Sequence, residues 1–195
     1  MIGKQKWLWP LLIVVALVQS AALFKMVYDR DLLLKTGREI TIPAHPVDPR
    51  DLFRGDYVTL GYDIASPRRA ALASDANFDA IRPGSIVYVT LSPDAAAGWK
   101  VATVAPEFPA QVAATDLVLR ARVKNIWHSE SKSEAQLNLR YGIESYFVPE
   151  GTGRALESKV RNGKIAAIVA VDASGAAALK GLVVDGERHV DPPLL

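Results

Sequence analysis

Two amphipathic stretches of the sequence carry side chains that can do acid–base chemistry. In "RGDYVTLGY", Asp56 and Tyr57 stand at the start of a β pattern, and in "LNLRYGIESYFVPEG" a second β pattern carries Glu144 on its polar face. Two carboxylates brought close together can act as a general acid and a general base. The predicted functional surface therefore consists of Asp56, Tyr57, Arg140, Glu144, Tyr146 and Glu150.

The same side chains have a purely structural interpretation, which stays open. Arginines lie near each carboxylate in the sequence, and exposed ion pairs of this kind contribute little to stability. We therefore assign no catalytic residue. The Arg54-Gly55-Asp56 tripeptide is a poor adhesion motif because its Asp begins a strand, and "PEGTGR" lacks the Lys-Ser/Thr of a phosphate-binding loop.

The composition argues against several kinds of site. The chain has no cysteine, which excludes disulfides, thiolate catalysis and cysteine-based zinc sites. Its three histidines have no ligand-like spacing, so we expect no metal and no cofactor. The net charge of +2 in 195 residues, without a basic patch, gives no reason to expect a nucleic-acid partner.

The N-terminus predicts a membrane span. Residues 7–24 contain no charged side chain, follow two lysines, and approach the roughly 20 residues that a spanning helix needs. The helix should continue to Gly37, which gives a segment 1–37 and an exported body 38–195. A cleaved signal peptide is the alternative, with Ser20–Ala22 as the cleavage site. Lysine and arginine flank both ends, so their count does not fix the orientation.

The body is dominated by alternating apolar and polar residues, the pattern of half-buried strands. We predict a mostly β fold, an antiparallel barrel or sandwich of about eight strands with one short helix at 151–163, preceded by the N-terminal transmembrane helix. The segment 136–148 should form one strand, in a long hairpin with 117–127. The predicted strands are 39–43, 56–64, 85–92, 99–105, 117–127, 136–148, 164–172 and 176–185.

The stretch "PVDPRDLFRGDY" predicts a capped turn that leads into a strand. Asp48 suits the N-cap of a single helical turn, Pro49 suits its first position, and Gly55 allows the chain to leave the turn. In the strand that follows, Leu60 and Tyr62 alternate with polar residues and should face the core, as should Val58 and Ile64.

The residues Gly55, Asp56, Tyr57, Leu60 and Tyr62 fit the pattern Gly-Asp-Tyr-x-x-Leu-x-Tyr. Together with "VYVTL" and "YGIESYFVPEGTGRALE", they make the chain resemble the GDYXXLXY family of bacterial membrane-anchored proteins over nearly its whole length. The resemblance implies an exported domain on a single helix, often encoded beside multi-pass membrane proteins. It implies no catalytic residue.

A weaker and partial resemblance is to the signal peptidase barrel. Leu52, Gly55 and Asp56 have the spacing of its motif, and Lys100 follows on a later strand where that family carries its general base. The nucleophile's position holds Val47, which has no hydroxyl. Serine–lysine chemistry needs that hydroxyl, so the resemblance does not imply peptidase activity.

These observations favour a membrane-anchored accessory or interaction module. Its expected partners are the lipid bilayer, through residues 7–24, and a multi-pass inner-membrane protein. We expect a single-pass protein of the bacterial inner membrane whose C-terminal domain faces the periplasm or the exterior. The alternative is an anchored enzyme or ligand-binding β-barrel that uses the clustered Asp, Glu and Tyr residues.

Overall fold

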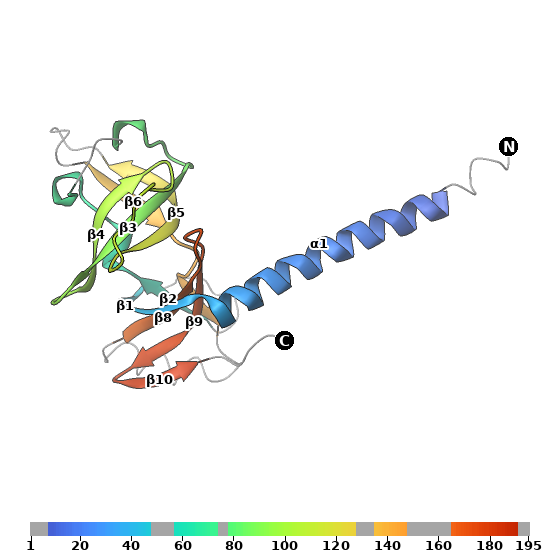
Figure 1. Cartoon of the computed structure of the whole chain (residues 1–195). Helices are drawn as coiled ribbons and strands as arrows, with labels where there is room; N and C mark the ends of the chain where they lie inside the picture. The colour runs from blue at the N-terminus through green and yellow to red at the C-terminus, as the bar shows by residue number, and fades with distance from the viewer. Residues whose placement is uncertain (1–7, 48–56, 74–77, 128–134, 148–164, 191–195) are drawn as a thin grey trace.

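A computed structural model describes residues 8–47, 57–73, 78–127, 135–147 and 165–190 (Figure 1). One long helix, α1 (Leu8–Thr36), leads into a body made of β-strands. The helix ends where the sequence predicts, at Gly37, whose N–H donates to the carbonyl of Leu33 at 2.9 Å. A Cβ at Gly37 would lie 2.6 Å from that carbonyl oxygen and 3.0 Å from the Val171 nitrogen, so only glycine fits between the helix and the body.

The last two turns of α1 pack against the body. Leu33 packs against Ala170 and Ala178, whose small side chains let the helix approach closely. The guanidinium of Arg30 donates to the carbonyl of Ala177 at 2.9 Å. Within the helix, the almost fully buried Asp31 pairs with Lys35 at 2.7 Å. The helix is thus fixed to the body by apolar and polar contacts together.

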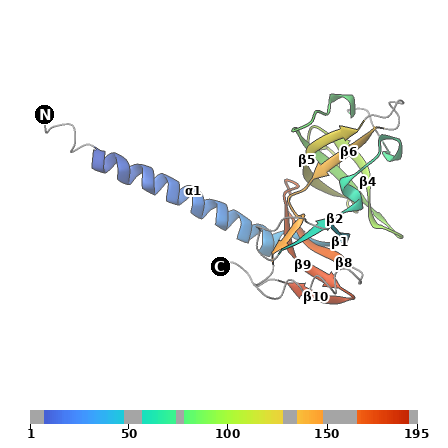
Figure 2. The same ribbon diagram turned by 180° about the vertical axis from the view of Figure 1, so that it is seen from behind.

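The body consists of two curled antiparallel sheets, so the predicted mostly β antiparallel fold is confirmed, with ten strands among the described residues (Figure 2). The six-stranded sheet has the order β10-β9-β8-β1-β2-β7 and the four-stranded sheet has the order β4-β3-β5-β6. The strands are β1 (Arg38–Val47), β2 (Tyr57–Gly61), β3 (Ile86–Asp94), β4 (Gly98–Ala105), β5 (Leu117–Trp127), β6 (Gln136–Arg140), β7 (Ser145–Phe147), β8 (Ile165–Val171), β9 (Ala177–Val184) and β10 (Glu187–Val190).

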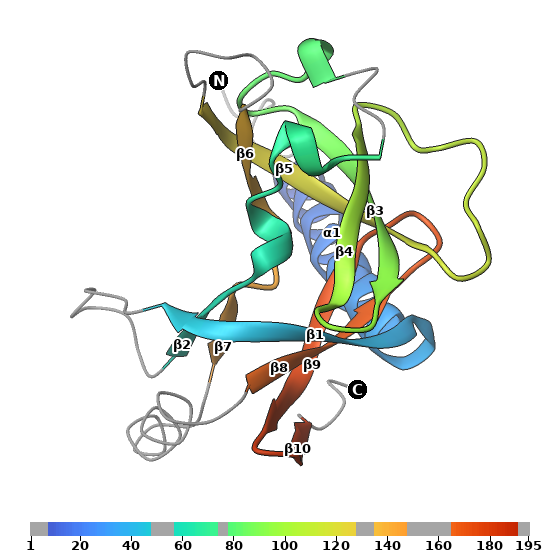
Figure 3. The same ribbon diagram turned by 90° about the vertical axis from the view of Figure 1, so that its left-hand side faces the viewer.

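Strand β1 links the helix to the rest of the body. It begins one residue after Gly37 and crosses the body (Figure 3). Its residues 38–44 pair with β8, and its residues 45–47 pair with β2. The carbonyl of Thr41 accepts a hydrogen bond from the Trp99 indole at 3.2 Å, which ties β1 to β4 of the other sheet.

The core lies between the inner faces of the two sheets, where apolar side chains from both pack together. The predicted inward face of the second strand is confirmed, since Val58, Leu60, Tyr62 and Ile64 are each at most 5% exposed. The strand itself is shorter than predicted. It ends at Gly61, and the 3₁₀ helix η2 (Asp63–Ala65) follows.

The prediction of one continuous strand over 136–148 is wrong. The chain breaks after Arg140, and Gly142 adopts φ +83°, a conformation that side chains disfavour. The first part, β6, forms the predicted hairpin with β5, while the second part, β7, joins the other sheet beside β2. The alternation reverses after Ile143, so Tyr146 is 7% exposed and Phe147 is 71% exposed.

Other differences concern short elements. Strand β10 and the 3₁₀ helices η2, η3 (Arg69–Ala71) and η4 (Phe78–Ala80) were not predicted. They lack the periodic pattern on which the predictions depend. The predicted helix at 151–163 lies outside the described residues.

Candidate functional site

Two tyrosines join the sheets by reciprocal hydrogen bonds. The hydroxyl of Tyr62, which follows β2, donates to the carbonyl of Ile143 at 2.7 Å. The hydroxyl of Tyr141, which follows β6, donates to the carbonyl of Ile64 at 2.8 Å. Each acceptor lies two residues from the other tyrosine, so the pair fastens η2 to the β6–β7 connection.

The environment of these tyrosines favours a structural role for their hydroxyls over a role in acid–base chemistry. Tyr62 is 3% exposed and Tyr141 is 6% exposed. Burial raises the pKa of both hydroxyls far above the usual value, and the negative charge of Glu144 raises each pKa further. Both groups therefore stay protonated donors at neutral pH.

Glu144 closes the turn between β6 and β7. Its carboxylate accepts the backbone N–H of Tyr141 at 2.6 Å and that of Gly142 at 2.9 Å. Its own carbonyl accepts the N–H of Leu60 at 2.8 Å. The Arg140 guanidinium is 3.9 Å from the carboxylate and its side chain is 65% exposed, so this ion pair is weak. Both carboxylate oxygens are thus engaged in holding the local backbone.

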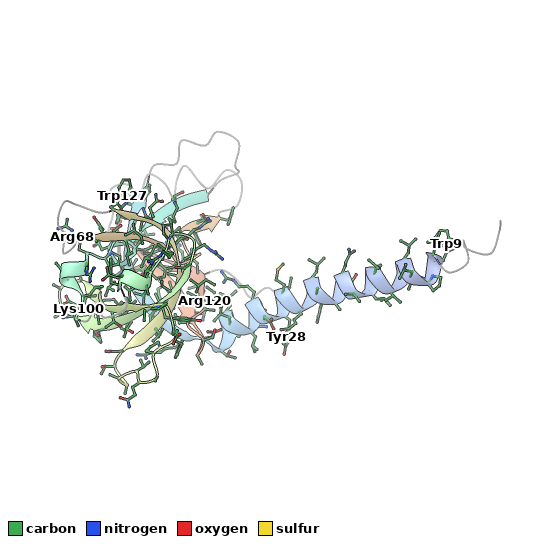
Figure 4. The ribbon with its side chains drawn as sticks, turned by 90° about the horizontal axis from the view of Figure 1, so that it is seen from above. Trp9, Tyr28, Arg68, Lys100, Arg120 and Trp127 are labelled. Carbon is green, nitrogen blue, oxygen red and sulfur yellow. The ribbon has the colours of Figure 1, made fainter. Side chains whose placement is uncertain are left out.

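An open groove of about 740 Å³ lies beside this junction. Its floor includes Leu60 and Tyr62, and its walls come from both sheets and from η2. Arg68 lies on the side of the body opposite to α1 (Figure 4). The histidine and the residues of charged type along the groove are His45, Asp63, Arg68, Lys124, Arg140 and Glu144.

The groove holds one histidine beside a carboxylate. His45 Nδ1 lies 4.0 Å from Asp63 Oδ1, with side chains 56% and 93% exposed, so solvent screens the pair. The His45 ring packs over Gly61, where a Cβ would collide with it. Among the described residues, no group of three or more His, Asp and Glu lies close enough to hold a metal ion.

The structure brings together only part of the predicted functional surface. Arg140 and Glu144 line the groove, as predicted for neighbours on one polar face. Tyr146 does not share that face, because the alternation reverses after Ile143 and its side chain packs in the core. The backbone of Tyr57 pairs with Phe147 in β2–β7.

Several predicted residues lie outside the described part of the chain: Asp48, Pro49, Gly55, Asp56 and Glu150. The proposed pairing of Asp56 with Glu144 therefore stays a prediction. In the signal peptidase comparison, Val47 has the nucleophile's position and Lys100 the general base's position. Val47 lines the groove. Lys100 lines a second cavity, of about 380 Å³, so the two positions do not share a site.

Sequence reasoning missed the other groove residues. No sequence pattern placed Lys124 near His45, Arg68 or Asn138, which line the groove with it. These residues come from distant parts of the chain, and only the tertiary fold brings them together. The one local signal was the glycine in "TLGY", since a strand glycine often marks a close approach of another group.

The described residues form a two-sheet β protein preceded by an apolar helix, and the motif residue Tyr62 helps to join the sheets through its bond to Ile143. A family model described as "GDYXXLXY protein" matches residues 19–182, and the chain belongs to this family. No curated protein and no solved structure matches the chain.

Removing either buried hydroxyl should destabilise the body. We expect Tyr62→Phe and Tyr141→Phe each to lower the free energy of unfolding by about 1–2 kcal/mol, because each leaves a carbonyl without its donor. Urea unfolding of the detergent-solubilised chain, followed by tryptophan fluorescence, measures this. The control is Tyr88→Phe, because Tyr88 is half-buried and its ring meets Phe108 edge-on at 5.4 Å. Equal effects at all three positions would contradict the role of the reciprocal bonds.

Glu144→Gln should also destabilise the body, by about 1–2 kcal/mol, because the amide group would face a backbone donor that the carboxylate now accepts. Arg140→Ala, beside it in the groove, should change the free energy of unfolding by less than about 0.5 kcal/mol. The same urea titration measures both. If Glu144→Gln instead left stability intact and abolished cellular function, an acid–base role for Glu144 would be supported.

Proposed function

We propose that this protein is a membrane-anchored interaction module that partners a multi-pass protein of the bacterial inner membrane. Residues 7–24 would span the bilayer as an uncleaved signal-anchor, and the body from residue 38 would face the periplasm or the exterior. The observation that carries the proposal is the direct junction between the span and the body. Gly37 alone separates α1 from β1.

The helix has the length and composition to anchor the body. It is 29 residues long and apolar enough to cross a membrane. Its large apolar side chains from Leu8 to Tyr28 are exposed, which suits contact with lipid. At 1.5 Å per residue, about 20 residues cross the hydrocarbon, and the final turns remain to dock on the body.

The docking makes the arrangement rigid. A simple tether needs no contact between span and body, yet here Leu33 and Arg30 both contact the body. A body held in this way presents the same face to its surroundings at a fixed distance from the membrane. That geometry supports recognition of a neighbour in the same membrane.

The first test distinguishes anchoring of the body by the span from the rigid connection between span and body. Replacing residues 7–24 with an unrelated span should remove a partner that co-purifies with the tagged chain in detergent. Inserting Gly-Gly-Ser-Gly after Tyr28 should weaken the same complex, because it leaves the docking contacts of Arg30 and Leu33 in place and uncouples the body from the span.

Alkaline carbonate extraction controls for insertion of each variant, and the mass of the mature chain reports whether residues 1–22 are retained. The proposal fails if the soluble body from residue 38 performs the whole cellular function in a deletion strain.

The groove favours a second candidate, a ligand-binding or enzymatic body. Its volume of about 740 Å³ falls in the range of small-molecule sites. Asn138→Trp would fill the groove and Lys124→Glu would reverse a charge along it, while Glu107→Lys alters an exposed charge that is not among the groove residues.

For a ligand site, the two groove variants should lose complementation of a deletion strain while the membrane complex and the thermal stability persist. Glu107→Lys should complement normally. Loss of the complex together with complementation would place the groove in the partner interface instead. Full complementation by both groove variants would eliminate this candidate.

A further inference from the structure

One strongly polar side chain lies inside the apolar part of α1. Between Leu8 and Phe24 the polar residues are Gln19 and Ser20. A serine hydroxyl can bond to the carbonyl one turn before it, whereas the glutamine amide brings two donors and an acceptor that the helix backbone does not satisfy. Gln19 is five residues from Phe24, roughly 7 Å inside that end of the span at 1.5 Å per residue.

The side chain of Gln19 is exposed along the helix, together with its neighbours on the same face. At 3.6 residues per turn, Leu12, Ala16, Gln19 and Leu23 share a face roughly 60° wide. We call these four residues the Gln19 face. Ala16 leaves room for a second backbone to approach closely, as small residues do in packed membrane helices.

The Gln19 face points to the side on which the body is docked. Arg30 follows Gln19 by eleven residues, close to three full turns, and its guanidinium bonds to the carbonyl of Ala177 in β9. Leu33, fourteen residues after Gln19, packs against Ala170 and Ala178. A protein that covers the Gln19 face within the membrane therefore stands on the same side as β8 and β9.

This direction argues against a second copy of the chain as the occupant. In a two-fold dimer across the Gln19 face, each helix would bring its own docked body into the space between the two helices. Both bodies would then compete for the same volume at the docked ends of α1. A helix of a different protein carries no such body and meets no such conflict.

We propose that the Gln19 face binds a transmembrane helix of another protein, one that offers a hydrogen-bonding side chain at the depth of Gln19. The inference rests on the proposed function, and it names the surface through which the span recognises its partner. The bound helix lies on the side of α1 that faces β8 and β9, so the partner contacts the span and the body together.

The test moves the amide without changing the composition of the span. The double variant Leu17→Gln with Gln19→Leu turns the amide about 160° around the helix and shifts its depth by about 3 Å. We expect it to retain about a tenth or less of the co-purified partner, the loss that follows from a membrane hydrogen bond and its packing. The measurement is quantitative co-purification of the tagged full chain in detergent.

Two single variants control the experiment. Gln19→Leu makes the span more apolar and inserts at least as well, so its expected loss of the partner cannot come from failed insertion. Leu17→Gln keeps Gln19 and adds an amide on the opposite face, and we expect it to hold close to the original amount of partner.

The outcomes separate this inference from the proposed function. If the double variant keeps the partner while replacement of residues 7–24 removes it, the Gln19 face is wrong and the proposed function stands. If the double variant and the span replacement each keep the partner, the Gln19 face and the proposed function are both wrong.

The chain has no cysteine, so a single cysteine introduced at Ala16 or Leu23 reports on self-association. Disulfide-linked homodimers at these positions, and not at Ala21, would overturn the inference in favour of a second copy.

Discussion

The reciprocal hydrogen bonds of Tyr62 and Tyr141 are the constraint on which the rest of the body depends. The two sheets meet where β6 gives way to β7, and at that point the chain leaves one sheet for the other. Such a crossing leaves backbone carbonyls to which no strand partner donates a hydrogen bond. The two hydroxyls satisfy the carbonyls of Ile64 and Ile143 from inside the core, and Glu144 satisfies the amides of the same turn.

This constraint gives the family motif a physical meaning. Leu60 and Tyr62 are buried at the junction, and the close packing of His45 over Gly61 explains a small residue between them. Among the described motif residues, Tyr62 takes part in the sheet crossing through its hydrogen bond to Ile143. The groove lies beside this crossing and is lined by residues of β2, η2 and β6.

The alternation of apolar residues was enough to predict the mostly β fold, the strand 117–127 and the buried face of the second strand, because each of these depends on a local period of two. The break at Gly142 could not be predicted from the sequence, because Leu139, Tyr141 and Ile143 are buried on both sides of it and keep the alternation of apolar residues. Only the reversed exposure of Tyr146 and Phe147 reveals the crossing. The groove could not be predicted, because its walls are far apart in the sequence and meet through tertiary packing.

The packing of α1 against the body bears both on recognition within the membrane and on ligand binding in the groove. Because α1 is docked through Arg30 and Leu33, its rotation about its own axis is fixed relative to the sheets. The azimuth of every residue in the span is therefore set by the body, and the Gln19 face is directed toward β8 and β9. The groove, with Arg68 on the side away from α1, points elsewhere. A helix bound to the Gln19 face would not cover the groove, so the proposed membrane recognition and the proposed ligand binding would use separate surfaces of the molecule.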